Sequence, residues 1–415
     1  MQAVVRHVLF PDPDQEHPVA LPRLTYPLTA GTFLMGTTEF VIAGLLPDLA
    51  RSFGVSVGQV GLAITVFAIG MVVGPPVITL ATLRVSRRTM LVLALLVFAV
   101  GQVVAATVPV FGVFLAARFV TAFATGAFWS VASVVAAKAA GPADTARALG
   151  VVIGGGNIAN VLGVPLGALA GLLVGWQVVF WALAVLAVVL VVPVWRIVEP
   201  SAETTHVSLR AELRGLRSGQ LWLVLATTAC ITGGVLSTYG YISPLLTERA
   251  GLPETAVPVA LVVFGAGSVV GSIVGGRLGD RRPLGTAMVI GSMTLVATIA
   301  VALTSTVPVL VLVSFGALGL VGFSANPILV ALATKLGGDA PNLTTAMPTT
   351  TFNLGTAIGT GIAAASLQGP LGALGPVTVG IVAGALMLVP LSALALRDRE
   401  RVTRSRTPAV GGTGR

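Results

Sequence analysis

The sequence predicts an all-α polytopic membrane protein with twelve transmembrane helices, arranged as two pseudo-symmetric six-helix bundles with both termini in the cytoplasm. Of the 415 residues, 55% are hydrophobic and only 9% are charged, against roughly a quarter charged in soluble domains. The mean hydropathy is +0.98. Lipid must therefore be the main solvent of this chain. Its length accommodates about a dozen spans of roughly 20 apolar residues with short loops.

The apolar runs predict twelve spans, none with the strict alternation of a membrane β-barrel. They are residues 27–49, 57–82, 89–107, 110–136, 147–172, 176–196, 220–243, 256–276, 285–304, 308–334, 343–366 and 371–396.

These spans divide the chain into five parts. Residues 1–26 are expected to be a cytoplasmic tail, because acidic residues and prolines replace the cationic start of a signal peptide. Residues 27–196 and 220–396 form the two bundles, joined by a cytoplasmic linker at 197–219. Residues 397–415 form a basic cytoplasmic tail, expected to be disordered near anionic headgroups.

The positions of the positive charges fix the orientation. With both termini in the cytoplasm, all but three of the 24 lysines and arginines fall in cytoplasmic segments. Arg51 and Arg249 lie on the opposite side, and Arg118 lies within a span. This asymmetry follows the positive-inside rule and places the chain in the inner (plasma) membrane as a multi-pass protein. It also explains the net charge of +9 without nucleic-acid binding.

Each half has a basic loop between its second and third spans, Leu83-Arg84-Val85-Ser86-Arg87-Arg88 and Gly276-Arg277-Leu278-Gly279-Asp280-Arg281-Arg282. Two such halves form an architecture in which substrate binds between them near the midplane. The pattern Gly276-x-x-x-Asp280-Arg281 resembles the loop signature of the major facilitator superfamily. The first-half loop departs from it at Leu83, where that family usually has Asp.

A narrower resemblance, to chloramphenicol-efflux and arabinose-efflux-like permeases, covers Met35 to about residue 390. It rests on Met35-Gly36-Thr37-Thr38-Glu39-Phe40 with Gly44-Leu45-Leu46-Pro47, Ala117-Arg118-Phe119 with Gly126-Ala127-Phe128-Trp129, Ala159-Asn160-Val161-Leu162-Gly163-Val164-Pro165-Leu166-Gly167, and Tyr239-Gly240-Tyr241-Ile242-Ser243-Pro244-Leu245-Leu246-Thr247. Phe323-x-x-Asn326-Pro327 and Phe352-Asn353-Leu354-Gly355 favour the chloramphenicol exporters. The resemblance implies proton-coupled antiport, although Val164 separates Gly163 from Pro165 in the fifth-span antiporter signature.

Glu39 is the only one of fifteen acidic residues that lies far from both ends of a span. An acidic side chain near the centre of a membrane helix costs about 2.5 kcal/mol or more on insertion scales, so such residues usually face a cavity or a partner. We expect Glu39 to alternate between proton and substrate. The alternative is a structural ion pair or hydrogen bond.

Arg118 is the only basic residue inside a span. In the resembled family an arginine here belongs to a motif linked to proton transfer. It stays charged, so its role would be to favour ionised Glu39 or to bind a polar substrate through its planar donors. The alternative is a fixed clamp between helices.

Aromatic and amide side chains within the spans are candidates for substrate binding, because a few polar groups among aromatic faces suit a partly apolar ligand. Each amide could equally bond another helix. The candidates are Phe40, Phe128, Trp129, Asn157, Asn160, Tyr239, Tyr241, Asn326 and Asn353.

Glycines recur every four residues in two spans, at Gly163, Gly167 and Gly171 in the fifth and at Gly267, Gly271 and Gly275 in the eighth. Faces without side chains let helices approach closely. We expect these two helices to pack at the interface between the halves and to slide during transport. The alternative is ordinary close packing, and both can be true.

Other function classes fit less well. The single cysteine, Cys230, forms no intrachain disulfide, and the three histidines lie outside the spans. A membrane enzyme would need paired catalytic residues, an ATP-driven pump a phosphate-binding loop, and a channel charged rings or repeated filters. We therefore expect a monomeric carrier without metal or cofactor that exports a small molecule, such as chloramphenicol, against protons. A sugar or metabolite exporter, proton-coupled uptake and facilitated diffusion are the alternatives.

Overall fold

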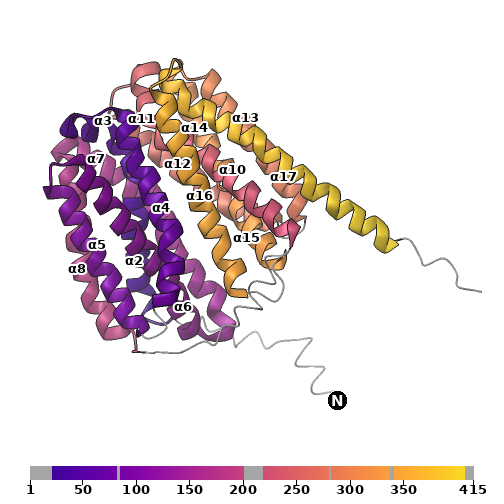
Figure 1. Cartoon of the computed structure of the whole chain (residues 1–415), viewed down its shortest axis with the longest axis horizontal. Coiled ribbons are helices and arrows are strands. Elements are labelled where there is room, and N and C mark those ends of the chain that lie inside the picture. Colours follow the sequence, from indigo (N-terminus) through magenta and orange to yellow (C-terminus); the bar gives the residue numbers. More distant parts are fainter. Residues whose placement is uncertain (1–20, 82–84, 201–217, 280–281, 337–340, 407–415) are drawn as a thin grey trace, which may run out of the picture.

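The computed structural model describes residues 21–81, 85–200, 218–279, 282–336 and 341–406. In these ranges the chain forms helices and turns, with no strand. The helices form two bundles that lie side by side, one from each half of the sequence (Figure 1).

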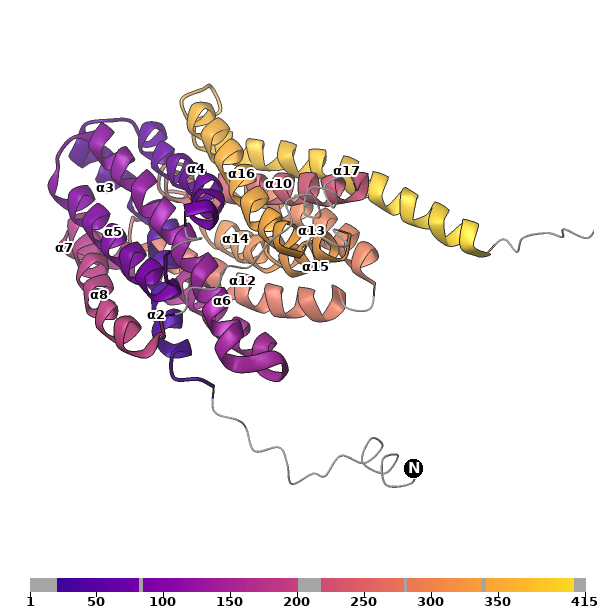
Figure 2. The same cartoon turned by 60° about the horizontal axis from the view of Figure 1, so that its bottom comes forward.

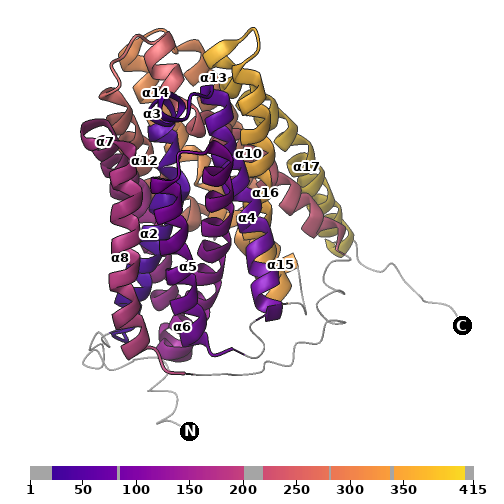
Figure 3. The same ribbon diagram turned by 60° about the vertical axis from the view of Figure 1, so that its left-hand side comes forward.

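The helices of the first half lie side by side in one bundle (Figure 3). They are α2 (Thr25–Phe40), α3 (Ile42–Phe53), α4 (Val57–Ala81), α5 (Arg87–Thr107), α6 (Phe111–Ile158), the π-helical turn η3 (Ala159–Gly163), α7 (Val164–Val174) and α8 (Trp176–Ile197). The long α6 contains the fourth span and the first part of the fifth, which continues through η3 and α7 to Val174. The two spans are separated at Gly141, whose φ of 73° lies in the left-handed region that glycine adopts most easily.

The second half repeats this organisation. Its elements are α10 (Gly219–Gly240), α11 (Ile242–Pro244), the π-helical turn η4 (Leu245–Arg249), α12 (Ala256–Gly279), α13 (Pro283–Leu303), α14 (Pro308–Gly322), α15 (Ala325–Leu336), α16 (Pro341–Leu367), the 3₁₀ turn η5 (Gly372–Leu374) and α17 (Gly375–Arg406).

Within the described ranges, ten helices are long and apolar enough to cross a membrane, and the bent pair of α2 and α3 adds an eleventh span. α16 lies where the sequence predicts the remaining span. It is not among those eleven, and its sequence is rich in threonine. The predicted spans thus coincide with helices in order and approximate bounds, and the multi-pass helical architecture is confirmed.

The first helix of each half is broken. α2 and α3 meet at Val41 with a bend of 52°, and α10 stops at Tyr241 before α11. A proline follows each break, Pro47 in α3 and Pro244 in α11. A proline lacks the N–H that would bond the carbonyl four residues earlier, and its ring bends the preceding turn. Corresponding helices are therefore discontinuous in both halves.

The C-terminal segment differs from the expectation. α17 continues past residue 396 to Arg406 and projects beyond the bundle (Figures 1 and 2). The predicted disorder of residues 397–415 is therefore wrong for its first ten residues. The arginines and acidic residues here are compatible with a helix once it leaves the lipid, so the end of the apolar run does not mark the end of the helix.

The fifth and eighth spans pack against each other between the halves, as predicted, but the contact does not run through their glycine faces. Gly163 lies against Thr37, and Gly167 lies against Val41, so the first face packs on the first span of its own half. In the second half, Gly271 lies against Leu320, within the tenth span. A glycine face permits close approach but does not specify its partner. The fifth and eighth spans do meet, where Gly265 lies against the backbone of Asn160.

α4 and α16 run side by side and join the halves (Figure 3). Their contact is close near the start of α4, where Gly61 lies under the ring of Tyr241, and the Tyr241 hydroxyl donates to the carbonyl of Thr360 over 3.0 Å. The hydroxyls of Thr65 and Thr360 are 2.9 Å apart. We call this end of the molecule, with the C-terminus of α3, the start of α4 and the end of α16, the α3 end.

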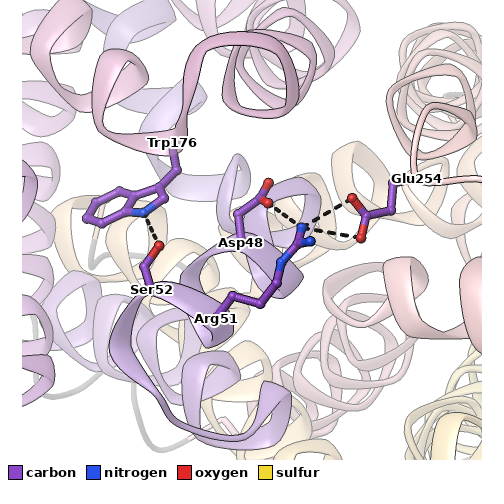
Figure 4. A network of polar contacts seen from close by, with 5 residues as sticks. All are labelled: Asp48, Arg51, Ser52, Trp176 and Glu254. Carbon is purple, nitrogen blue, oxygen red and sulfur yellow. Dashed lines mark hydrogen bonds and ion pairs between the residues drawn. The ribbon is translucent and has the colours of Figure 1, made fainter.

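An ion pair also joins the halves at the α3 end (Figure 4). Arg51 donates to Asp48 on its own helix over 2.6 Å, and to Glu254, in the loop before α12, over 3.2 Å. The side chains of Arg51 and Glu254 are 62% and 41% exposed. Exposed ion pairs contribute at most about 1 kcal/mol. The α3 end is therefore held mainly by its uncharged contacts.

We predict that Gly61→Ala weakens the closure of the α3 end, because the added methyl group would overlap the ring of Tyr241. The measurement is disulfide cross-linking of Ser56→Cys with Gln368→Cys, whose native side chains are hydrogen-bonded at 3.3 Å, in a Cys230→Ser background. We expect the cross-linked fraction to fall. Gly112→Ala is the matched control, since a methyl group there meets no atom within 4 Å. Equal cross-linking in both variants would contradict the prediction.

Candidate functional site

A cavity lies between the two halves, with a volume of about 340 Å³ including its open mouth. We call it the central cavity. The first half lines it with Glu39, Phe40, Ala43, Ile64, Phe67 and Ala68, and the second half with Leu236, Tyr239, Gly240, Asn353 and Thr356. Both helix breaks border it, because Glu39 and Phe40 precede Val41, and Tyr239 and Gly240 precede Tyr241.

Glu39 is half-buried and faces the central cavity. In the described part of the chain its carboxyl group makes no hydrogen bond and no ion pair. The first half surrounds it with apolar side chains, including Phe40, Ile64 and Phe67. The other polar side chains of the wall, Tyr239, Asn353 and Thr356, come from the second half and make no described hydrogen bond to it. A carboxyl group in such surroundings loses its water without gaining a protein partner. It is therefore available to a proton or to a donor group on a ligand.

Arg118 is fully buried behind the central cavity and does not line it. Its Nη1 donates to the hydroxyl of Thr38 over 2.9 Å, and its guanidinium carbon lies 4.2 Å from the centre of the Phe67 ring. No partner is described for Nε and Nη2. The amide of Gln102 donates to the same Thr38 hydroxyl over 2.7 Å. Arg118 is therefore linked to the cavity wall only indirectly. It contacts Thr38, which directly precedes Glu39, and Phe67, which lines the cavity.

Tyr239 is held in an aromatic cluster. Its ring meets Phe40 edge-on at 5.9 Å between centroids, which joins the two halves across the central cavity. On the other side it packs against Phe264 at 4.7 Å and Phe315 at 6.3 Å. Such pairs each contribute about 0.5–1.5 kcal/mol beyond burial. The cluster fixes the ring, and its hydroxyl makes no hydrogen bond to a described residue.

Two polar side chains of α16 complete the wall. Asn353 donates its amide to the carbonyl of Thr349 over 3.0 Å, which leaves its own carbonyl oxygen as an acceptor. Thr356 donates to the carbonyl of Phe352 over 2.9 Å, which likewise leaves its oxygen lone pairs. With the carboxylate of Glu39, the cavity offers mostly acceptors. This arrangement suits a ligand that carries hydroxyl, amide N–H or ammonium donors.

Four of the proposed binding and coupling residues thus meet in the central cavity, namely Glu39, Phe40, Tyr239 and Asn353. Asn326 lines a second cavity within the second half, of about 290 Å³, which we call the C-terminal cavity. Its other lining residues are Thr228, Ile231, Thr232, Val235, Leu236, Gly322, Phe323, Leu329 and Phe352.

The remaining candidates lie elsewhere. Phe128 is fully buried against Gly31, and Trp129 is half-buried against Gly156, both inside the first bundle. Asn157 is exposed. None of these three lines either cavity.

Asn160 and Tyr241 lie between the halves but outside both cavities. Asn160 lies against Gly265, and Tyr241 is buried at the α3 end. The structure therefore places them at helix contacts.

The residues of the two predicted signatures, in the fifth span and in the basic loop of the second half, are described only in part. Gly163 ends the π-helical turn η3, Pro165 follows at the start of α7, and Gly167 faces the first span. The N–H of Val164 reaches back to the carbonyl of Ala159, five residues earlier, so the signature coincides with an irregular turn. Gly276 lies in α12, where an added methyl group would be in ordinary contact with Pro327 at 3.9 Å. Asp280 and Arg281 lie outside the described residues.

Several cavity residues were not singled out from the sequence. Leu236 and Thr356 lie three residues from the candidates Tyr239 and Asn353, which is helical spacing and offered a signal. Phe67 is the only aromatic residue of α4. The other lining residues have no polar or aromatic side chain, so the sequence does not show whether they line a cavity or contact lipid. They are Ala43, Ile64, Ala68 and Gly240.

Comparison with known proteins identifies relatives over most of the chain. The family model described as "Major Facilitator Superfamily" matches residues 28–360. The chloramphenicol resistance protein of Streptomyces lividans is 36% identical over 89% of this chain and 95% of its own length. The inner membrane transport protein YdhP of Escherichia coli K12 is 33% identical over 89% and 97%. The putative transporter AraJ of the same strain is 30% identical over 61% and 64%.

Solved structures show the same fold. A bacterial homologue of the human lysosomal transporter Spinster, in an inward-facing, occupied conformation, superposes with a TM-score of 0.74. The match covers 93% of this chain and 98% of that one at 15% identity.

We predict that Arg118→Met folds but does not transport. Methionine fills the buried space. It removes a charged guanidinium group whose Nε and Nη2 have no described partner, so little stability is lost. We expect a thermal unfolding midpoint within a few degrees of the wild type. Transport should fail, because the positive charge that biases Glu39 is gone. Gln102→Leu is the control, since it removes a second donor to Thr38 without changing charge. If Arg118→Met is unstable yet transports in proportion to its folded fraction, Arg118 is a clamp.

Proposed function

Because the chain belongs to the Major Facilitator Superfamily and is a multi-pass membrane transporter, we propose that it exports a small, partly apolar molecule in exchange for protons by alternating access. The observation that supports this most strongly is the Glu39 carboxyl, which faces a cavity shared by both halves without a described hydrogen-bond or ion-pair partner. A group that must bind proton and substrate in turn has to be free of fixed protein partners.

An antibiotic such as chloramphenicol is the proposed substrate. One relative over nearly the whole chain bears the name chloramphenicol resistance protein. The central cavity supports the assignment, since the rings of Phe40 and Phe67 suit an aromatic ligand, and the Glu39 carboxylate and the Asn353 carbonyl suit hydroxyl and amide donors. A sugar or metabolite exporter, or an uptake carrier, is the second candidate, because other relatives bear general transporter names.

The proposed cycle has two main states. With the α3 end closed and the cytoplasmic side accessible, drug binds while Glu39 is ionised. The halves then rock, the contacts of Gly61 and Thr65 with the second half separate, and a proton from outside neutralises Glu39 and releases the drug. The protonated carrier returns and loses its proton inside. Each charge that crosses 100 mV contributes about 2.3 kcal/mol, more than the roughly 1 kcal/mol of the exposed Arg51–Glu254 pair.

We predict that Glu39→Gln abolishes export and keeps the fold, because glutamine has the same shape but cannot release a proton. The measurement is accumulation of radiolabelled chloramphenicol in cells that express the wild type, the variant or an empty vector, with and without a protonophore. The wild type should lower accumulation only without the protonophore, and the variant should match the empty vector at equal membrane abundance. Export by Glu39→Gln would make the carboxyl structural. Equal accumulation with wild type and empty vector would rule out chloramphenicol.

We also predict that chloramphenicol binding to the purified wild type weakens as the pH falls. Protonation removes the negative charge that accepts the donors of the drug, so the complex is favoured above the pKa of Glu39 and lost below it. Equilibrium binding in detergent across a pH series measures this. Binding to Glu39→Gln should not vary over the same range. A wild-type affinity that is constant with pH would contradict competition between drug and proton.

A further inference from the structure

The central cavity and the C-terminal cavity share one lining residue, Leu236 of α10. Along this helix the wall of the C-terminal cavity continues into that of the central cavity. The lining positions are Thr228, Ile231, Thr232, Val235, Leu236, Tyr239 and Gly240. They recur every three or four residues, which places them on one face of a helix. From Thr228 to Gly240 the face is about 18 Å long at 1.5 Å per residue.

α16 forms a second continuous wall. Phe352 lines the C-terminal cavity, and the next residues on the same helix, Asn353 and Thr356, line the central cavity. The two cavities are therefore bounded by the same pair of helices. Leu236, which is only 3% exposed, is the side chain at which they meet.

The chemistry of the two cavities differs. The C-terminal cavity has no charged lining residue, and its rings, Phe323 and Phe352, lie 6.2 Å apart between centroids. Its threonine hydroxyls are used locally, since Thr228 and Thr232 each donate to a carbonyl of α10 over 3.0 Å.

The side-chain amide of Asn326 is the exception. It makes no hydrogen bond to any residue that the structure describes. The amide is half-buried on the cavity wall, where a polar group of a ligand can reach it. The C-terminal cavity therefore offers an aromatic wall with one hydrogen-bonding side chain that has no described partner.

We propose that the C-terminal cavity is a second section of the substrate site and that Leu236 controls how far a substrate reaches into it. The substrate class is an elongated molecule with an uncharged aromatic ring at one end and hydroxyl or amide donors at the other. The ring lies against Phe323 and Phe352 near Asn326, and the donors face Glu39. This inference rests on the proposed export function and adds the orientation of the substrate and the residue that limits its length.

Cysteine protection tests the proposal on the full-length protein in a Cys230→Ser background. Single cysteines replace Thr356 in the central cavity, Asn326 in the C-terminal cavity, and Val110, which is 53% exposed between α5 and α6. Each purified variant is treated with N-ethylmaleimide, with and without saturating chloramphenicol. We expect chloramphenicol to slow labelling of Thr356→Cys and Asn326→Cys and to leave Val110→Cys unchanged.

The outcomes separate the two proposals. Protection of Thr356→Cys without protection of Asn326→Cys would confine the drug to the central cavity, and it would overturn the second section while the export function stands. Protection of neither, together with no export by the wild type, would overturn both for chloramphenicol.

A size change at Leu236 gives an independent test. Leu236→Phe narrows the passage between the cavities. We expect the chloramphenicol dissociation constant to rise by about tenfold or more, because modest overpacking costs enough free energy to weaken binding by that factor. Leu354→Phe makes the same change on α16 at a position that is 45% exposed, and it should bind as the wild type does. Equal affinity of Leu236→Phe and Leu354→Phe, with both proteins folded by thermal melting, would overturn the role of Leu236.

Discussion

In a bilayer every backbone N–H and C=O must find a partner inside the protein, and the rest of this structure depends on that constraint. It is the reason that the spans are helices, and it limits where a helix can break. Both first spans break, at Val41 and Tyr241. The residues just before each break, Glu39 with Phe40 and Tyr239 with Gly240, line the central cavity. Irregular backbone is thus tolerated where it borders a cavity, and the same positions carry the polar groups that a substrate would meet.

The two charged side chains within the spans, Arg118 and Glu39, have different surroundings. Arg118 is surrounded on all sides and is held by Thr38 and the face of Phe67, which satisfies part of a permanently charged group. Glu39 has no such partner among the residues that the structure describes, and it faces the cavity. The two charges are therefore close in the fold without being joined by an ion pair, and a protonation change at one need not break a bond to the other.

The sequence predicts the large-scale architecture well because its signals are strong. Apolar runs and the positions of arginines locate the spans, and the rare charge Glu39 points to the cavity. The sequence does not predict which faces of the helices pack against each other. The glycine spacing correctly indicates that the fifth and eighth spans pack together, but Gly163 and Gly271 themselves each pack within their own half, because a missing side chain does not specify which helix fills the space. Phe128 and Phe40 are alike in sequence, yet one is core and the other lines the cavity. That difference depends on helix rotation, which composition does not encode in a uniformly apolar span.

The α3 end has a consequence for the surroundings in which this carrier works. The sequence predicts that this end faces outside the cell, where the protein meets whatever salt concentration the environment supplies. Exposed charges attract each other over about 10 Å in 0.1 M salt and over about 3 Å in 1 M salt. The Arg51–Glu254 pair is subject to this screening, but the tyrosine ring over Gly61 and the paired threonine hydroxyls are not. Closure of the outer side should therefore depend little on the ionic strength.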